Sequence, residues 1–183
     1  MRLAALLLLL AASCASTTTT THPAPPATPA SAEHDWLMQL VGDWEAVSEM
    51  EAEAGAEPTR WVGTEDIDAI GALWVVAEGE VDFGEEHFES RMTLGYDPEQ
   101  RCFVGTWIDS VQSHLWNYRG QLDADQRALT LEAQGPSIVE PGRTTLYRDR
   151  IELVTPDHKR LVSAMREDDG TWTTYMEVDY YRR

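Results

Sequence analysis

The feature that most constrains the fold is a period-two alternation of apolar and polar residues, which recurs along most of the chain. In residues 44–53, Trp44 and Ala46 fall on one face, while Glu45 and Glu49 fall on the other. Successive side chains of a β-strand point to opposite faces, so this pattern predicts a half-buried strand. No segment between the alternating stretches suits a long helix, which excludes parallel crossover units.

The same alternation predicts about ten strands. They are expected at residues 44–53, 60–67, 73–83, 87–96, 102–109, 112–122, 128–134, 144–153, 160–167 and 172–181. Short turns such as Asp97-Pro98 and Asp169-Gly170 separate them, and turns of this kind join neighbouring antiparallel strands. An up-and-down barrel leaves no exposed sheet edge. We therefore predict an all-β antiparallel up-and-down barrel, preceded by a short helix at residues 33–40.

The start of the chain has the form of a targeting signal. Residues 3–12 are an apolar run that follows Arg2 and is too short to span a membrane. The sequence Ala11-Ala12-Ser13-Cys14 resembles the lipobox of bacterial lipoproteins, in which the signal is cut before a cysteine that receives lipid. We expect residues 1–14 to be a lipoprotein signal peptide with lipidation at Cys14; an ordinary cleaved secretory signal is the alternative.

The next segment, residues 15–32, cannot build a core. It contains only Ala, Thr, Pro, Ser and one His, and its prolines favour extended geometry. We expect a tether that carries a single folded domain at residues 33–183. Ala15 occupies the position where an Asp would suggest retention in the inner membrane, so the predicted location is the cell envelope, at the outer membrane and facing the periplasm.

Charge narrows the range of partners. Fourteen Lys and Arg oppose 32 Asp and Glu, which gives a formal net charge of -18. Nucleic acids and anionic membrane surfaces both require clustered cations, so we expect no nucleic-acid partner and membrane contact through the lipid anchor only. The sequence contains neither zinc-spaced Cys and His residues nor a calcium-binding loop, and we expect no metal site.

Alternation also predicts which side chains face the barrel interior. Met92, Trp107, Trp116 and Tyr118 would form an apolar wall, which suits a flat or greasy ligand but also suits an ordinary core. His114 shares a face with Trp116 and Tyr118 in a predicted strand. We expect it to point inward, either as a ligand anchor or proton-transfer group, or as a core histidine bonded to a neighbour.

Two acidic residues share predicted faces with apolar neighbours. Asp149 shares a face with Tyr147, so it must be paired or have a raised pKa unless it is solvated near a strand end. Its expected partner is His114 or a tyrosine hydroxyl. Glu65 shares a face with Trp61 and could be a second buried acid.

A series of segments in order along residues 33–183 carries a family resemblance. The first is Leu37-x-x-Leu40-x-Gly42-x-Trp44, which is similar to the opening of calycin-type barrels such as the lipocalins. The others are Gly71-Ala72-Leu73-Trp74-Val75-Val76, Met92-Thr93-Leu94-Gly95-Tyr96-Asp97, Phe103-Val104-Gly105-Thr106-Trp107, His114-Leu115-Trp116, Gly135-Pro136-Ser137 and Tyr147-Arg148-Asp149. Together they resemble the bacterial domain of unknown function 1579 family. The resemblance implies a ten-stranded, lipocalin-like barrel and no established activity.

The opening also resembles that of nitrobindin, a haem-binding barrel whose haem ligand is a histidine near the end of the chain. The last predicted strand, residues 172–181, has no histidine, and the nearest one, His158, falls in a predicted turn. Ferric haem in such a barrel needs an imidazole ligand. We therefore expect neither haem nor another cofactor.

Three functions remain open at this point. The first is an envelope-anchored barrel that binds a small, mostly apolar ligand. The second is a structural or protein-interaction barrel with a filled core. The third is an enzyme that uses His114 as acid or base, with Asp149 or Glu65 orienting it. The residues expected to contact a ligand are His114, Trp107, Trp116, Tyr118, Asp149 and Met92.

Overall fold

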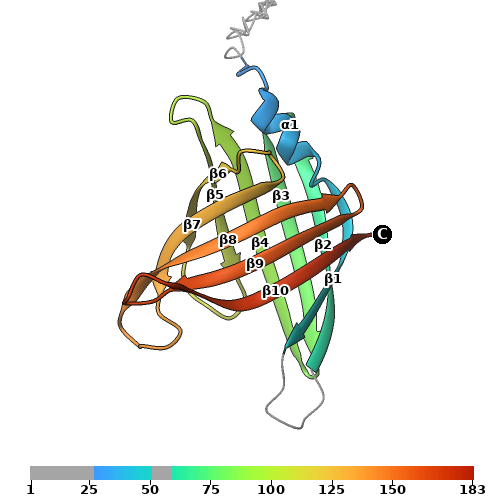
Figure 1. Ribbon diagram of the computed structural model, residues 1–183. Coiled ribbons are helices and arrows are strands. Elements are labelled where there is room, and N and C mark those ends of the chain that lie inside the picture. Colours follow the sequence, from blue (N-terminus) through green and yellow to red (C-terminus); the bar gives the residue numbers. More distant parts are fainter. Residues whose placement is uncertain (1–26, 51–58) are drawn as a thin grey trace, which may run out of the picture.

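The computed structural model describes residues 27–50 and 59–183, whose strands follow one another around a closed barrel (Figure 1). The expected signal peptide, most of the expected tether and positions 51–53 of the first predicted strand lie outside these residues. Among the described residues there is one helix, α1 (Ala32–Met38). The strands are β1 (Gly42–Met50), β2 (Thr59–Ile70), β3 (Trp74–Phe83), β4 (Glu86–Asp97), β5 (Cys102–Asp109), β6 (Trp116–Leu122), β7 (Ala128–Pro136), β8 (Thr144–Thr155), β9 (His158–Arg166) and β10 (Trp172–Arg182).

Each strand pairs in antiparallel fashion with the next, and the last strand pairs with the first. In the closing pair, Trp44 lies opposite Arg182 and Val47 lies opposite Asp179. This pairing joins the two edges of the sheet, so the backbone groups that an open edge would expose are satisfied within the barrel. The predicted all-β up-and-down barrel of about ten strands is confirmed.

Helix α1 covers one end of the barrel, which we call the closed end (Figure 1). Trp36 and Leu37 are buried in the core beneath the helix, together with Leu40 just after it. The indole Nε1 of Trp36 donates to the carbonyl of Gln126, in the turn between β6 and β7, at 2.9 Å. The helix is too short to be stable in isolation, so this buried face and its hydrogen bond hold it in place.

Trp44, at the start of β1, is fully buried under the helix. Its Nε1 donates to the carbonyl of Leu40 at 2.9 Å, and the guanidinium of Arg182 lies 4.2 Å from the centre of its ring. Arg182 also donates to the carbonyl oxygens of Val41, at 2.8 Å, and Gln39, at 3.2 Å. One arginine on β10 thus satisfies carbonyl groups left free where the helix ends, and it also stacks on the tryptophan of β1.

The opposite end, which we call the mouth, includes among the described residues the connections at residues 84–85, 110–115, 137–143 and 167–171. One of them differs from prediction, because the strand expected at residues 112–122 begins only at Trp116. The Oδ1 atom of Asp109 accepts hydrogen bonds from the backbone N–H groups of Val111, at 2.7 Å, and Gln112, at 2.6 Å. This turn bends the chain away from β5 and replaces the first residues of the predicted strand.

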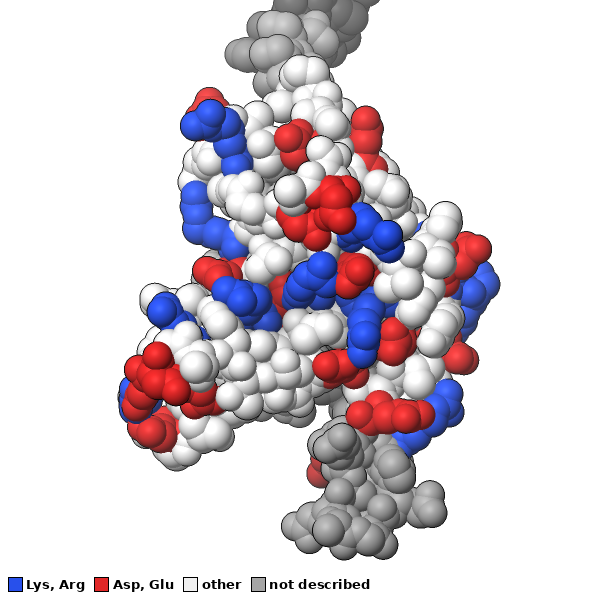
Figure 2. Space-filling view, in the orientation of Figure 1, with Lys and Arg blue, Asp and Glu red and all other residues white. Residues whose placement is uncertain are grey.

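The outer surface mixes charges of both signs. On the face seen in Figure 2, Lys and Arg side chains lie among Asp and Glu side chains, without a large basic area. Cross-strand ion pairs contribute to this pattern, including Arg160 with Glu177 and Arg148 with Glu132. Within the described ranges, the structure has no helix of the length and apolar character that crossing a bilayer requires.

The closed end generates a stability prediction. Leu37→Ala removes a fully buried side chain between the helix and the barrel and is expected to lower the free energy of unfolding by about 2–5 kcal/mol. Ile70→Ala is the control, because Ile70 is 61% exposed and its truncation should change stability by less than about 0.5 kcal/mol. Urea denaturation followed by tryptophan fluorescence measures both. Equal effects of the two variants would show that the helix contributes little to the core.

Candidate functional site

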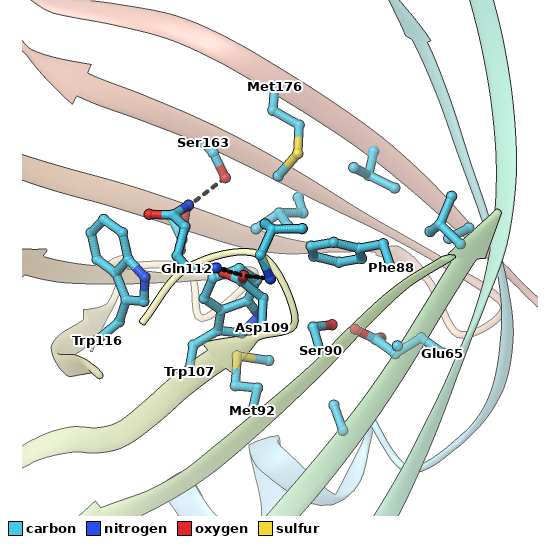
Figure 3. Close-up of a pocket in the computed structure, with 18 of the residues that line it drawn as sticks. Glu65, Phe88, Ser90, Met92, Trp107, Asp109, Gln112, Trp116, Ser163 and Met176 are labelled. Atoms are coloured by element: carbon cyan, nitrogen blue, oxygen red, sulfur yellow. Dashed lines mark hydrogen bonds between the residues drawn. The ribbon is translucent and has the colours of Figure 1, made fainter. Parts of the chain in front are cut away.

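A cavity of about 310 Å³ occupies the barrel between the core of the closed end and the mouth (Figure 3). Its volume falls at the lower end of the range for small-molecule sites. Nearly every strand contributes to the lining, as do two of the mouth connections. The interior is therefore not filled, in contrast to the predicted alternative of a barrel with a filled core.

Aromatic side chains form much of the wall. Trp107 and Trp116 lie edge to face with their ring centres 6.5 Å apart, and Phe88 lies 6.4 Å from Trp107. Met92 and Tyr118 also line the cavity. The alternation along β4, β5 and β6 thus placed all four predicted wall residues on the interior face, as expected.

Asp149, on β8, lies in the cavity wall among hydroxyl groups. The hydroxyl of Tyr118 donates to its Oδ2, and the hydroxyl of Ser163 donates to its Oδ1 at 2.5 Å. Burial raises the pKa of the Asp149 carboxyl above its ordinary value, although both hydrogen bonds favour the ionised form. The structure thus pairs this interior acid, and its partners are Tyr118 and Ser163 rather than His114.

Two buried polar atoms of lining residues have no hydrogen-bond partner among the described residues: Oδ2 of Asp109 and Nε1 of Trp116. Asp109 follows Trp107 by two positions on β5, so it shares the inward face. The indole nitrogen of Trp116 lies on the side of its ring that faces Gln112 and Trp107 (Figure 3). Leaving such groups unpaired costs about 1–3 kcal/mol each, which a ligand with a donor and an acceptor would recover.

The placement predicted for His114 is wrong. It lies in the connection before β6, is half-buried and is absent from the cavity lining. Its Nε2–H donates to the carbonyl of Gln134 at 3.2 Å, and its ring packs edge-on against Trp116 at 4.9 Å. The turn that Asp109 nucleates removed this residue from the strand, and with it the inward orientation. The proposed acid–base arrangement of His114 with Asp149 or Glu65 is not assembled in the structure.

Glu65, predicted as a second buried acid, is largely buried, with 12% of its side chain exposed, and pairs with Lys159 of β9 in the barrel interior. The Lys159 ammonium lies 3.6 Å from the ring centre of Tyr180 and 5.1 Å from that of Trp44. Burial lowers the pKa of Lys159, while Glu65 opposes that shift. The pair separates the packed core of the closed end from the cavity, and sequence reasoning did not identify Lys159 as an interior residue.

Other lining residues were also missed. The pairing of β9 with β10 changes register between Thr174 and Met176, so Tyr175 is an extra residue in a β-bulge. Both Tyr175 and Met176 line the cavity. Strict alternation assigns those two residues to opposite faces. Gln112 reaches the cavity through the Asp109 turn. An Asp followed closely by Gln and Ser was the available signal for that turn.

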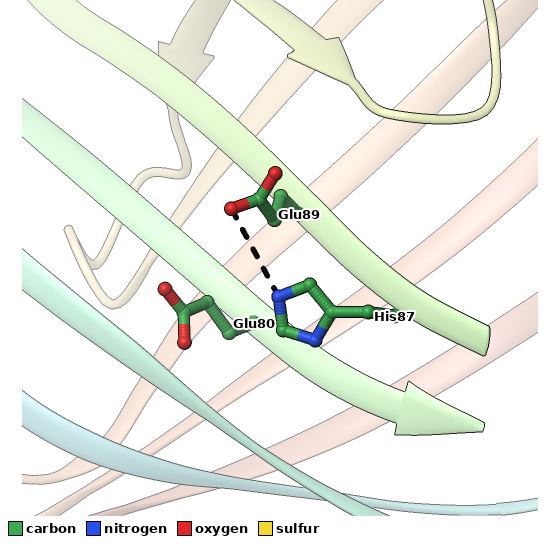
Figure 4. A group of neighbouring side chains, drawn as sticks. All are labelled: Glu80, His87 and Glu89. Carbon is green, nitrogen blue, oxygen red and sulfur yellow. Dashed lines mark ion pairs between the residues drawn. The ribbon is translucent and has the colours of Figure 1, made fainter. Parts of the chain in front are cut away.

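On the β3–β4 hairpin, Glu80, His87 and Glu89 place one potential ligand atom each within 4.8 Å of one another (Figure 4). The Nδ1–H of His87 donates to Asp82 at 2.7 Å, which raises the pKa of His87. All three residues of the group are exposed on the β3–β4 hairpin. Their geometry is that of a surface ion-pair group, of which only Glu80 also borders the cavity.

The environment of Asp149 generates a pH-dependent prediction. Because the folded-state pKa is raised above 3.8, the folded protein binds this proton more tightly than the unfolded chain. The resulting stabilisation is present at low pH and is lost as the pH rises through the folded-state pKa. Asp149→Asn removes the titration and should raise the free energy of unfolding at pH 7 by about 0.5–2 kcal/mol.

Urea denaturation between pH 4 and pH 8 measures this effect. Asp66→Asn, at an exposed position of β2, is the matched control and should leave the pH dependence unchanged. A lower stability of Asp149→Asn at pH 7 would instead show that the hydrogen bonds from Tyr118 and Ser163 outweigh the cost of burial.

Comparison with known proteins agrees with this architecture. The S-type phycobiliprotein lyase CPES from Guillardia theta has the same fold, with a TM-score of 0.52 and 17% identity over 84% of this chain and 93% of that chain. Rv2717c from M. tuberculosis matches with a TM-score of 0.52 and 12% identity over 81% of this chain and 96% of that chain. No curated protein matches the chain. The model of the family described as protein of unknown function (DUF1579) matches residues 29–182, and the chain belongs to this family.

Proposed function

We propose that this protein binds a small, mostly apolar molecule inside its barrel. The observation that carries the proposal is the cavity of about 310 Å³ with aromatic walls and two unpaired polar atoms. Binding would draw its free energy from burial of apolar ligand surface, at about 25 cal/mol per Å². The polar atoms of Asp109 and Trp116 would fix the orientation of the ligand.

The mouth supports entry of an apolar molecule. Large apolar side chains are exposed there rather than buried, and they belong to several different connections or adjoining strand ends: Phe83, Val111, Leu115, Ile138, Val139 and Tyr175. Three of them, Val111, Ile138 and Tyr175, also line the cavity, so apolar surface is continuous from the outside to the interior. Exposed apolar patches of this kind mark binding sites in soluble domains. The likeness to CPES concerns the fold, and the proposal rests on the cavity itself.

We further propose that the domain is held in the bacterial cell envelope by lipid on Cys14, at the outer membrane and facing the periplasm. The support is the sequence of residues 1–32, with its apolar run, lipobox-like cysteine and tether composition. Residue 27 leads into α1 at the closed end, which is the end opposite the mouth (Figure 1). A tether attached there would leave the mouth free to exchange ligand.

The ligand proposal predicts that filling the cavity blocks uptake. Ser90→Phe places a large ring in the cavity at a position that lines it and now carries a small side chain. Titration with Nile red, a neutral apolar dye, should show a saturable site in the parent protein and at least about tenfold weaker binding in the variant, because the ring occupies the volume that the dye needs.

Arg91→Phe is the matched control, since it introduces the same side chain one position later, where it points to solvent. It breaks only an exposed ion pair with Glu78, which contributes little. Unchanged dye affinity in Ser90→Phe, with the fold intact by circular dichroism, would contradict the assignment of the cavity as the binding site.

The anchoring proposal has a separate test. Cys14→Ala removes the thiol that would receive lipid, and the variant expressed in a Gram-negative bacterium should move from the membrane fraction to the soluble fraction. Cys102→Ala is the control, because Cys102 is buried in the barrel wall. Incorporation of radiolabelled palmitate measures the modification directly. Membrane association and labelling that persist in Cys14→Ala would refute lipid attachment at this residue.

A further inference from the structure

We propose that the cavity selects a ligand with a basic nitrogen: an apolar amine that is positively charged at neutral pH, in preference to neutral or anionic molecules of the same shape. The inference deepens the proposed function and rests on it. The volume and the apolar walls of the cavity limit the size and the polarity of the ligand. The charged residues of the lining determine which polar group the ligand carries.

The charged residues of the lining are all acidic. They are Glu65, Glu80, Asp109 and Asp149, and the described residues that line the cavity include no Lys, Arg or His. Two of the four acids are less suited to contact a ligand. Glu65 already pairs with Lys159, and Glu80 belongs to the exposed group on the β3–β4 hairpin. Asp109 and Asp149 remain.

Asp109 offers the stronger contact. Its Oδ1 atom is used by the backbone of the turn, while its Oδ2 atom is buried without a partner among the described residues. A buried carboxylate oxygen needs a donor, and a charged ammonium donor forms a stronger hydrogen bond than a neutral hydroxyl. A carboxylate on the ligand would instead be repelled. The unpaired oxygen therefore favours a cationic donor.

Asp149 supplies a second acidic group in the same wall. Tyr118 and Ser163 each donate to one of its oxygens, and each carboxylate oxygen can accept a further hydrogen bond. A cation nearby would favour the ionised form of this carboxyl, against the effect of burial.

The barrel interior already holds one ammonium group in this way. The Nζ of Lys159 is buried, pairs with Glu65 and lies 3.6 Å from the ring centre of Tyr180. A carboxylate and an aromatic face together compensate the ammonium for its lost hydration. The cavity offers the same combination without a cation, because Asp109 lies beside Trp107 and Trp116 in the lining. An amine ligand would occupy that second position.

Charge on the whole protein acts in the same direction. The formal net charge of -18 produces a negative potential that raises the local concentration of cations and repels anions. This effect is screened by salt, whereas the contact with a buried carboxylate is screened much less.

Three probes with one aromatic group test the inference: naphthylethylamine, naphthylethanol and naphthylacetate, which are cationic, neutral and anionic at pH 7. Calorimetric titration of the full domain at 150 mM salt should show the amine binding at least about tenfold more tightly than the alcohol, with the acid weakest. Asp109→Asn retains an acceptor for the turn and removes the charge, so it should lower amine affinity about tenfold and leave alcohol affinity unchanged.

Asp66→Asn is the control for a lost surface charge and should change none of the three affinities. If Asp109→Asn does not fold, the order of the probes on the parent protein still decides the question. Saturable binding of the alcohol with equal or higher affinity than the amine would overturn the inference and leave the proposed function in place. Failure of all three probes and of Nile red to saturate would overturn both.

Discussion

The packing of Arg182 on Trp44 is the contact on which the rest of the barrel depends. It joins β10 to β1 where the sheet closes, and the same guanidinium binds the carbonyl groups left free beyond α1. One residue thus contributes both to closure of the sheet and to the capping of the helix end. With that end sealed by packed side chains, the opposite end can remain hollow, because the closed backbone ladder keeps the wall in shape without a filling of side chains.

The interior combines two kinds of buried charge, and they have different consequences. Glu65 and Lys159 compensate each other and divide the packed half of the barrel from the open half. Asp149 and Asp109 have hydroxyl or backbone donors but no cation in the described structure. Uncompensated acids in an apolar wall lower the stability of a fold, and departures of this kind are expected at functional sites.

The fold could be predicted from sequence because alternation and turn residues act locally, and both were plain along the chain. The wall residues Met92, Trp107, Trp116 and Tyr118 followed from the same rule. Prediction failed where one residue interrupts the alternation. Asp109 starts a turn that carries His114 out of its strand, and the bulge at Tyr175 shifts the register of β10. The partners of Asp149 and Glu65 could not be predicted either, since they depend on contacts between distant strands.

The contact between Arg182 and the carbonyl of Val41 spans 141 positions of the sequence. A chain that emerges from the ribosome with its amino end first can pair β1 with β2, and each later strand with its predecessor, as soon as each appears. It cannot close the barrel until β10 is available, so Trp44 lacks its contact with Arg182 until the last strand has been made. Every other strand pair joins neighbours in the sequence, so the closing pair is the long-range step, and assembly is expected to end there.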